Sequence, residues 1–340
     1  MSSALEPIPA DACVLVTARY FDDSASDALR NAGLEVLSGG VAYDAVDSEI
    51  TDGMHRALAR CSAWIMGIPP VSSDLLARYP RLRVLARRGV GYDTIDVAAV
   101  KAHGRVLTIT PGSNEATVAD HAVGLMLAVA RRFFESHRRM QAGEQGVLVG
   151  TELSGKTVGL IGLGRIAQLV ARRLEGFGVR IMAYDPHLSA HVAVRGVEMA
   201  SLEAVLETSD FVSLHAPLTD ATRHLINART LARMKRGAIL INTARGELVD
   251  DAALLAALKD GKLAGAGLDV LSSERDASRD AVTRELLALP TAICTQHTGG
   301  SSREGLARAN MHAAQCVISA LQGLPLPQGS IVADGRAHER

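Results

Sequence analysis

The sequence has no excess of charge of either sign. Its 36 lysines and arginines are matched by 37 aspartates and glutamates, which gives a formal net charge of −1 at neutral pH. Such a balance provides neither the basic surface that attracts nucleic acid nor a polybasic tract for a membrane surface. No apolar run reaches the ~18 residues of a membrane-spanning helix, and the first residues lack the regions of a signal peptide. We therefore expect a soluble cytoplasmic protein with neither nucleic acid nor a membrane as a partner.

Cysteines and aromatic residues are also scarce. The four cysteines, Cys13, Cys61, Cys294 and Cys316, are scattered without the close spacing of a metal site. Because three of them stand in apolar strand-like or helix-like patterns, we interpret the cysteines as small buried apolar residues, and we expect no bound metal. Aromatic residues make up 3% of the chain, which is rich instead in Ala, Leu and Val, a composition that suits alternating helices and parallel strands. The length of 340 residues predicts two domains.

The most informative segment present is a glycine-rich turn after the apolar run Val158–Ile161, which predicts a strand buried on both faces. Gly162 permits a tight turn, and Gly164 lets the backbone approach a pyrophosphate. The helix predicted from about Arg165 offers its free N–H groups to the phosphates. Ala167 takes the third position of the glycine pattern, where a small residue suffices for helix–strand packing. The segment predicts a dinucleotide site; the alternative is an ordinary turn in another doubly wound fold.

An acidic residue stands at the end of the next predicted strand. Asp185 lies about 20 residues beyond Gly164, where a carboxylate accepts the ribose hydroxyl groups of an adenosine. The same negative charge would repel a phosphate on the 2′ oxygen. The sequence therefore predicts NAD as the cofactor in preference to NADP.

Short apolar runs alternate with helical patterns along most of the chain, as in parallel sheets with helical crossovers. The first series has predicted strands at 13–16, 34–37, 63–66, 84–86 and 106–109, and predicted helices at 24–32, 49–60, 73–78 and 97–103. One long apolar helix is predicted at 115–140 as a connection between domains. The second series has predicted strands at 158–161, 181–184, 211–214, 238–242, 266–270 and 292–295, followed by a helix at 303–321 and a polar tail at 328–340.

The two series predict an α/β protein with two doubly wound parallel-sheet domains. The strands of the second series match the two halves of a dinucleotide-binding fold. We expect the last helix to return to the first domain. That domain would then be discontinuous, at 1–110 and 301–340, around a nucleotide-binding domain at 111–300.

Three polar residues, Arg245, Glu274 and His297, follow the last three predicted strands of the second series. Ligands bind at the carboxyl ends of strands in open α/β sheets. Each residue has a structural alternative: Arg245 could form a surface salt bridge, Glu274 could be one solvated charge among several, and an isolated histidine is more often structural. Because they follow successive strands, we interpret them together as a catalytic group.

These side chains suit hydride transfer between a nicotinamide cofactor and a 2-oxo acid. A guanidinium such as that of Arg245 binds a carboxylate with two parallel hydrogen bonds and polarises the adjacent carbonyl. A protonated His297 would give a proton to the carbonyl oxygen. Glu274 would favour the charged ring and fix its orientation.

These motifs resemble those of the D-isomer-specific 2-hydroxyacid dehydrogenase family over residues 10 to 325. The resemblance implies a Rossmann NAD domain inserted in a flavodoxin-like substrate domain, NAD-dependent interconversion of a 2-oxo acid and a D-2-hydroxy acid, and a homodimer. The separations between Arg245, Glu274 and His297 also agree with the family pattern. Besides the glycine-rich turn, the resemblance is carried by Arg88–Asp96 (RGVGYDTID), Leu214–Thr219 (LHAPLT), Asn242–Asp250 (NTARGELVD), Ala264–Val270 (AGAGLDV) and Gln296–Gly299 (QHTG).

The resemblance also implies roles by position. Arg245, Glu274 and His297 match the family's catalytic residues, and Asp269 matches the acid that holds the nicotinamide carboxamide. The positions implied for the substrate are Val90, Gly91, Asn114, Arg245 and His297. The positions implied for NAD are Gly162, Gly164, Arg165, Ile166, Asp185, His215, Pro217, Thr222, Thr243, Ala244, Asp269, His297 and Gly299.

One departure from the family pattern bears on the substrate. The overall pattern is most like the D-3-phosphoglycerate dehydrogenase branch, without a regulatory domain after residue 330. The Arg-Ser pair that those enzymes use for the substrate phosphate aligns near Met66 and Gly67, so that contact is missing unless Arg87, Arg88 or Arg275 replaces it. A reductase of glyoxylate, hydroxypyruvate or another small 2-oxo acid is therefore the alternative. A protein that senses NAD(H) without catalysis is a third hypothesis.

Overall fold

The computed structural model describes residues 8–9, 11–39, 50–188, 194–274 and 276–336. Its contacts divide the chain into two compact units. We call Met1–Asn114 with Ser301–Arg340 the terminal unit and Glu115–Gly300 the central unit. The contacts place the division after Asn114, whereas the sequence patterns placed it after residue 110.

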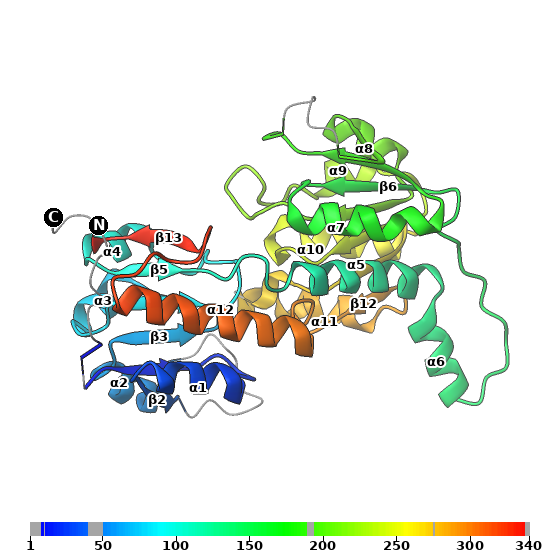
Figure 1. Ribbon diagram of the computed structural model, residues 1–340. Helices are drawn as coiled ribbons and strands as arrows, with labels where there is room; N and C mark the ends of the chain where they lie inside the picture. The colour runs from blue at the N-terminus through cyan, green and yellow to red at the C-terminus, as the bar shows by residue number, and fades with distance from the viewer. Residues whose placement is uncertain (1–7, 10, 40–49, 189–193, 275, 337–340) are drawn as a thin grey trace. The chain divides into compact units, whose positions relative to one another are not determined.

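The terminal unit contains one sheet in the order β13-β5-β4-β3-β1-β2 (Figure 1). Its strands are β1 (Cys13–Val16), β2 (Glu35–Ser38), β3 (Ala63–Met66), β4 (Val84–Arg87), β5 (Val106–Thr108) and β13 (Ile331–Asp334). The first five pair in parallel in the flavodoxin-like order. The prediction of a polar tail from residue 328 is wrong over β13, which pairs antiparallel with β5. So short a strand has no periodicity of its own and depends on its partner.

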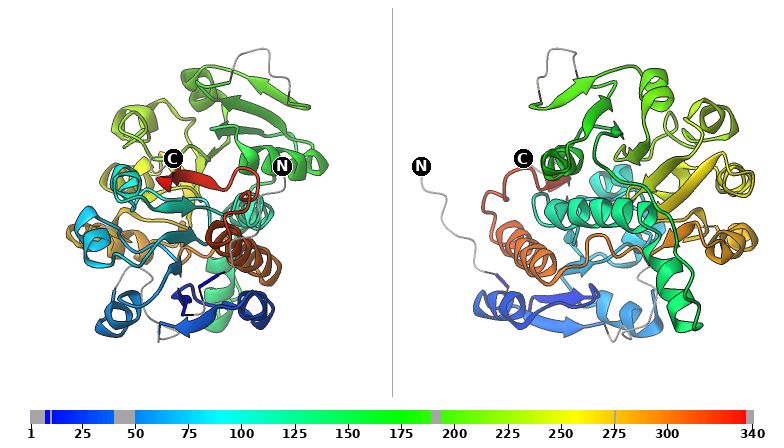
Figure 2. Two further views of the ribbon diagram at one scale, coloured as in Figure 1. Left: turned by 60° about the vertical axis from the view of Figure 1, so that its left-hand side comes forward. Right: turned by 90° about the vertical axis from the view of Figure 1, so that its right-hand side faces the viewer.

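Helices cover both faces of this sheet. One face carries α1 (Asp23–Asn31) and α12 (Arg303–Leu321), which lie side by side (Figure 2). The other carries α2 (Asp52–Leu58), α3 (Ser73–Arg78) and α4 (Val97–Ala102). Each helix follows a residue whose side chain accepts a hydrogen bond from the first turn, namely Asp22, Ser302, Thr51, Ser72 and Asp96. These caps satisfy N–H groups that have no partner within the helix.

The central unit contains a parallel sheet in the order β8-β7-β6-β9-β10-β11-β12. Its strands are β6 (Thr157–Ile161), β7 (Arg180–Tyr184), β8 (Val197–Met199), β9 (Phe211–Leu214), β10 (Ala238–Asn242), β11 (Leu263–Leu268) and β12 (Ala292–Cys294). This is the Rossmann order with one further strand. No pattern in the sequence predicted β8, and β11 begins at Leu263 and ends at Leu268 instead of covering the predicted 266–270.

The helices of the central unit also lie on both faces of their sheet. One face carries α5 (Glu115–Ala130) and α7 (Arg165–Leu174), which run side by side (Figure 1). The other carries α8 (Leu202–Thr208), α9 (Ala228–Arg233), α10 (Asp251–Lys259) and α11 (Asp280–Ala288). Single turns of tighter helix occur at η1 (Glu175–Phe177), η2 (Gly246–Leu248), η3 (Ser272–Glu274) and η4 (Ala277–Arg279).

The single helix predicted at 115–140 is instead two helices, because α5 ends at Ala130 and α6 (Phe133–Gln141) begins after Arg132. Arg132 has the left-handed backbone φ of 53°, which ends an α-helix. The chain later returns to this point, and Thr151 N donates to Ala130 O over 2.8 Å. The break therefore depends on a contact with a later segment, and neither Gly nor Pro marks it in the sequence.

Two glycines of β11 bring α5 close to the sheet. A Cβ on Gly265 would lie 2.6 Å from Val129 Cγ1, and a Cβ on Gly267 would lie 3.0 Å from Leu125 Cβ. Four residues of α-helix and two residues of strand each advance about 6 Å. The helix thus runs antiparallel to β11. Every fourth residue of the helix lies above every second residue of the strand.

All four cysteines are free thiols, and Cys13, Cys61 and Cys316 are buried. Burial raises the pKa of the Cys316 thiol and raises that of Cys294 to about 11. They therefore stay protonated near neutral pH, as expected of small apolar residues. Within the described ranges, none of the helices is both long and apolar enough to span a bilayer.

We predict that Gly265→Ala lowers the free energy of unfolding by about 1–3 kcal/mol, because the new methyl group would overlap Val129 and the carbonyl oxygen of Thr291. Urea titration of the purified variant measures this. Gly176→Ala is the matched control, since that glycine is exposed and a Cβ there meets no described atom within 4 Å. Equal stability of Gly265→Ala and the unsubstituted protein would contradict the close packing of α5 on β11.

Candidate active site

The turn after β6 requires glycine at its first position. Gly162 has a φ of +89°, and its N–H donates to Tyr184 O over 2.8 Å. A Cβ on this residue would lie 2.8 Å from the carbonyl carbon of His215 and from Ala216 N. Both the backbone conformation and the contact with the segment after β9 therefore exclude a side chain.

Gly164 is different, because none of the described residues requires glycine there. It is the N-cap of α7 with a φ of −72°, and a Cβ on this residue would meet no described atom within 4 Å. Ile166 and the exposed Arg165 occupy the first helical turn, while Ala167 is fully buried against the sheet. The missing side chain leaves space over the free N–H groups of α7, as a bound pyrophosphate needs.

Asp185 directly follows β7, and the backbone holds its carboxylate. Leu163 N donates to its Oδ2 and His187 N to its Oδ1, each over 2.9 Å. Each carboxylate oxygen keeps one lone pair for a further donor. Asp185 is therefore fixed beside the glycine turn with accepting capacity left on both oxygens.

His215, Pro217 and Thr222 lie in the loop after β9. Burial lowers the pKa of His215 to about 4, so its ring is neutral near pH 7. Its Nε2 lies 3.0 Å from Ser213 Oγ. The Thr222 hydroxyl donates to Pro217 O over 2.7 Å, and this hydrogen bond joins the two ends of the loop segment 217–222. The neutral ring of His215 therefore adds no charge to this loop near pH 7.

The turn after β10 presents Thr243, Ala244 and Arg245. The buried Asn242 side chain holds this turn, since its Nδ2 donates to Arg245 O over 2.8 Å and its Oδ1 accepts from Ala244 N over 3.0 Å. The Arg245 guanidinium donates to Ala244 O over 2.7 Å through Nη1. Thr243 Oγ1 is buried and has no hydrogen-bond partner among the described residues. Such an atom suits a hydrogen bond to a bound ligand.

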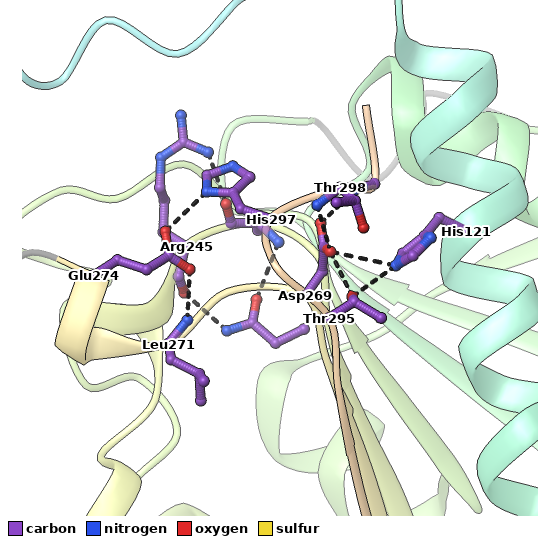
Figure 3. A network of polar contacts seen from close by, with 11 residues as sticks. His121, Arg245, Asp269, Leu271, Glu274, Thr295, His297 and Thr298 are labelled. Carbon is purple, nitrogen blue, oxygen red and sulfur yellow. Dashed lines mark hydrogen bonds and ion pairs between the residues drawn. The ribbon is translucent and has the colours of Figure 1, made fainter. Parts of the chain in front are cut away.

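His297 and Glu274 form a direct pair, with Nδ1 and Oε2 2.8 Å apart (Figure 3). Because an ionised carboxylate only accepts, the ring donates through Nδ1, and Nε2 is left to exchange a proton with a ligand. The other carboxylate oxygen, Oε1, accepts from Leu271 N over 3.0 Å and so fixes the pair. About a third of each side chain is exposed, 38% for His297 and 34% for Glu274, so the pair is accessible.

Asp269 follows β11 and is almost fully buried, with 2% of its surface exposed. Its Oδ1 accepts from Thr295 Oγ1 (2.5 Å) and Thr298 N (2.8 Å), and its Oδ2 accepts from Gly299 N (2.8 Å). Burial acts to raise the pKa of this carboxyl, but hydrogen bonds from His121, Thr295 and Gly299 outweigh it and lower the pKa. The residue is therefore a buried carboxylate that caps the turn carrying His297 (Figure 3).

The remaining predicted substrate residues belong to the terminal unit. Val90 and Gly91 lie in the loop after β4, where Gly91 O accepts from Arg87 Nε over 2.9 Å. Asn114 is the last residue of the first segment of that unit, and its Oδ1 is buried without a partner among the described residues.

The residues that support the site were not predicted from the sequence; they are Asn242, His121, Thr295 and Thr298. Asn242 carries a recognisable signal, since a polar residue ends an otherwise apolar strand. His121 carries none, because its contact with Asp269 joins positions far apart in the chain.

Comparison with known proteins agrees with this architecture. Residues 123–299 match the family model described as D-isomer specific 2-hydroxyacid dehydrogenase, NAD binding domain. The chain is 41% identical to a glyoxylate reductase from Korarchaeum cryptofilum over 75% of this chain and 77% of that protein. It is 37% identical to D-3-phosphoglycerate dehydrogenase from Mycobacterium tuberculosis over 92% of this chain, but spans only 59% of that longer protein.

Among solved structures, the TT0316 protein from Thermus thermophilus aligns with a TM-score of 0.83 and 35% identity, covering 94% of this chain and 100% of that one. The likeness thus includes both units. The Rossmann order of the central unit agrees with the description of the family model as an NAD binding domain. The chain belongs to the D-isomer-specific 2-hydroxyacid dehydrogenase family.

Proposed function

We propose that the protein is an NAD-dependent oxidoreductase that interconverts a 2-oxo acid and a D-2-hydroxy acid. The observation that carries the proposal is the pair of His297 and Glu274, 2.8 Å apart at the carboxyl edge of the Rossmann sheet. Arg245 reaches the same edge from the neighbouring turn (Figure 3). A cation for a carboxylate and an oriented acid–base group are what such a reaction requires.

The described residues fit NAD at this site. The space at Gly164 suits the pyrophosphate and the fixed carboxylate of Asp185 suits the adenosine ribose, while Thr243 Oγ1 offers a buried polar atom without a partner. The charge on Asp185 disfavours a 2′-phosphate and hence NADP. When bound, the nicotinamide ring supplies or accepts the hydride. Asp269 Oδ2 would accept a hydrogen bond from its carboxamide.

The protein's own residues then perform three tasks. Arg245 binds the substrate carboxylate and polarises the adjacent carbonyl group. His297 holds the transferable proton on Nε2, which gives it to the carbonyl oxygen during reduction and takes it back from the hydroxyl group during oxidation. Glu274 stabilises the protonated ring through Nδ1 and keeps its orientation.

For the substrate, we propose a small unphosphorylated 2-oxo acid such as glyoxylate or hydroxypyruvate. The two arginines near the loop at Met66 donate to main-chain carbonyls, Arg87 to Gly91 O and Arg88 to Arg19 O over 2.6 Å. Each guanidinium is thus engaged within the terminal unit, and a substrate phosphate would have to compete with these carbonyl groups for it. Arg275, the third candidate cation, lies outside the described residues. The alternative is 3-phosphohydroxypyruvate, the oxidised form of D-3-phosphoglycerate, which the mycobacterial relatives' name suggests.

We further propose that the protein is a homodimer, with α6 and the following arm, residues 142–152, covered by a second copy of the chain. None of the residues of α6 is buried. Phe133 and Phe134 are 56% and 50% exposed, and Val147 in the arm is 90% exposed. Exposed apolar side chains on α6 and on the segment after it indicate an interface, and the family resemblance implies a dimer.

We expect light scattering after size-exclusion chromatography to give twice the mass of the 35.8 kDa chain. Phe134→Glu should shift that mass toward the monomer, because a charge would be buried in the interface. The matched control is Leu287→Glu, at another exposed apolar position. A monomer before any substitution would contradict the proposed dimer.

We predict that Arg245→Ala lowers kcat/KM for the preferred 2-oxo acid at least about 100-fold, because a charge-assisted bidentate contact is lost. The dissociation constant of NADH should stay unchanged. The assay is NADH oxidation with glyoxylate, hydroxypyruvate, pyruvate, phenylpyruvate and 3-phosphohydroxypyruvate, with NADPH in parallel. The control variant is Arg229→Ala, an exposed arginine on α9.

Each outcome of this assay decides a separate point. Preference for 3-phosphohydroxypyruvate would overturn the proposal of an unphosphorylated substrate and support the alternative. Unchanged kinetics of Arg245→Ala would overturn its assigned role. Inactivity with every acid, despite NADH binding, would favour the NAD(H)-sensing hypothesis.

A further inference from the structure

His121 of α5 contacts the carboxylate that caps the catalytic turn. Its Nε2 lies 3.0 Å from Thr295 Oγ1 and 3.3 Å from Asp269 Oδ1 (Figure 3). The Thr295 hydroxyl donates its only proton to Asp269 Oδ1, so it accepts from the ring. His121 Nε2 therefore carries a proton and acts as the donor to both groups.

This arrangement leaves the two oxygens of Asp269 unequal. Oδ1 accepts hydrogen bonds from Thr298 N, the Thr295 hydroxyl and His121. These three donors use the accepting capacity of Oδ1. Oδ2 receives a single hydrogen bond from the described residues, that of Gly299 N. Oδ2 is thus the oxygen able to accept one more N–H group.

The packing of α5 on β11 brings His121 to this position. Val129 lies against Gly265 and Leu125 against Gly267. His121 lies one helical turn before Leu125, and Asp269 lies two residues after Gly267. The same register that seats the helix on the glycines therefore brings the imidazole to the carboxylate.

We propose that His121 is a positioning residue for the nicotinamide carboxamide: by occupying Oδ1 together with Thr295, it turns Oδ2 of Asp269 toward the carboxamide N–H₂ group. The proposal rests on the proposed function, since it assumes that NAD binds at this edge. A positioning role for His121 differs from a general packing role in one respect. Loss of His121 would weaken contacts of the nicotinamide end of the cofactor and leave the adenosine and pyrophosphate contacts unaffected.

The test compares three ligands by isothermal titration calorimetry: NADH, ADP-ribose, which lacks the nicotinamide, and reduced 3-acetylpyridine adenine dinucleotide, which lacks the carboxamide N–H₂ group. His121→Leu removes the donor, whereas His121→Gln keeps an N–H donor at a similar reach. We expect His121→Leu to weaken NADH binding about tenfold, the scale of one hydrogen bond to a charged group. ADP-ribose and the acetyl analogue should bind His121→Leu as they bind the unsubstituted protein, and His121→Gln should restore most of the NADH affinity.

Equal weakening of NADH and ADP-ribose by His121→Leu would overturn the proposal and show a purely structural role. Unchanged NADH binding by this variant would also overturn it. Thr295→Val is a second variant for the same network, and it should reproduce the selective loss for NADH even if His121→Leu does not fold. If the unsubstituted protein binds neither NADH nor ADP-ribose, the NAD site itself is contradicted, and with it both proposals.

Discussion

The hydrogen bonds to the buried carboxylate of Asp269 are the interactions on which the rest of the candidate site depends. A buried negative charge is stable only when donors surround it, and here they come from α5, from the end of β12 and from the turn after it. The turn between Thr295 and Gly299 is thereby held in one conformation. His297, with a φ of 52°, occupies a backbone region that costs free energy without such support.

This carboxylate also connects the packing of the unit to its chemistry. Gly265 and Gly267 allow α5 to approach β11, and the approach brings His121 within reach of Asp269. The placement of the His297–Glu274 pair therefore depends on helix–sheet packing about two helical turns away. In our account the same residue would orient the cofactor and hold the turn of the proton donor, so the two would be positioned together.

The sequence predicted the parts of this protein whose signal is local. The strand and turn at Gly162 and the three polar residues after successive strands follow from periodicity and from the rule that parallel strands end at one edge. The missed features depend on contacts between distant segments. The break of the long helix at Arg132 involves a return of the chain at Thr151, β13 needs β5 as a partner, and His121 meets Asp269 across the helix–sheet interface.

The most direct test of the central role of Asp269 is the turnover number of Asp269→Asn at saturating NADH. An amide would present N–H₂ to at least one of the donors that now surround the carboxylate, so the turn carrying His297 would be disturbed. We predict that kcat falls at least about tenfold even when the cofactor site is filled. An unchanged kcat with a raised KM for NADH would show that Asp269 serves the cofactor alone, and would contradict its role in holding the proton donor.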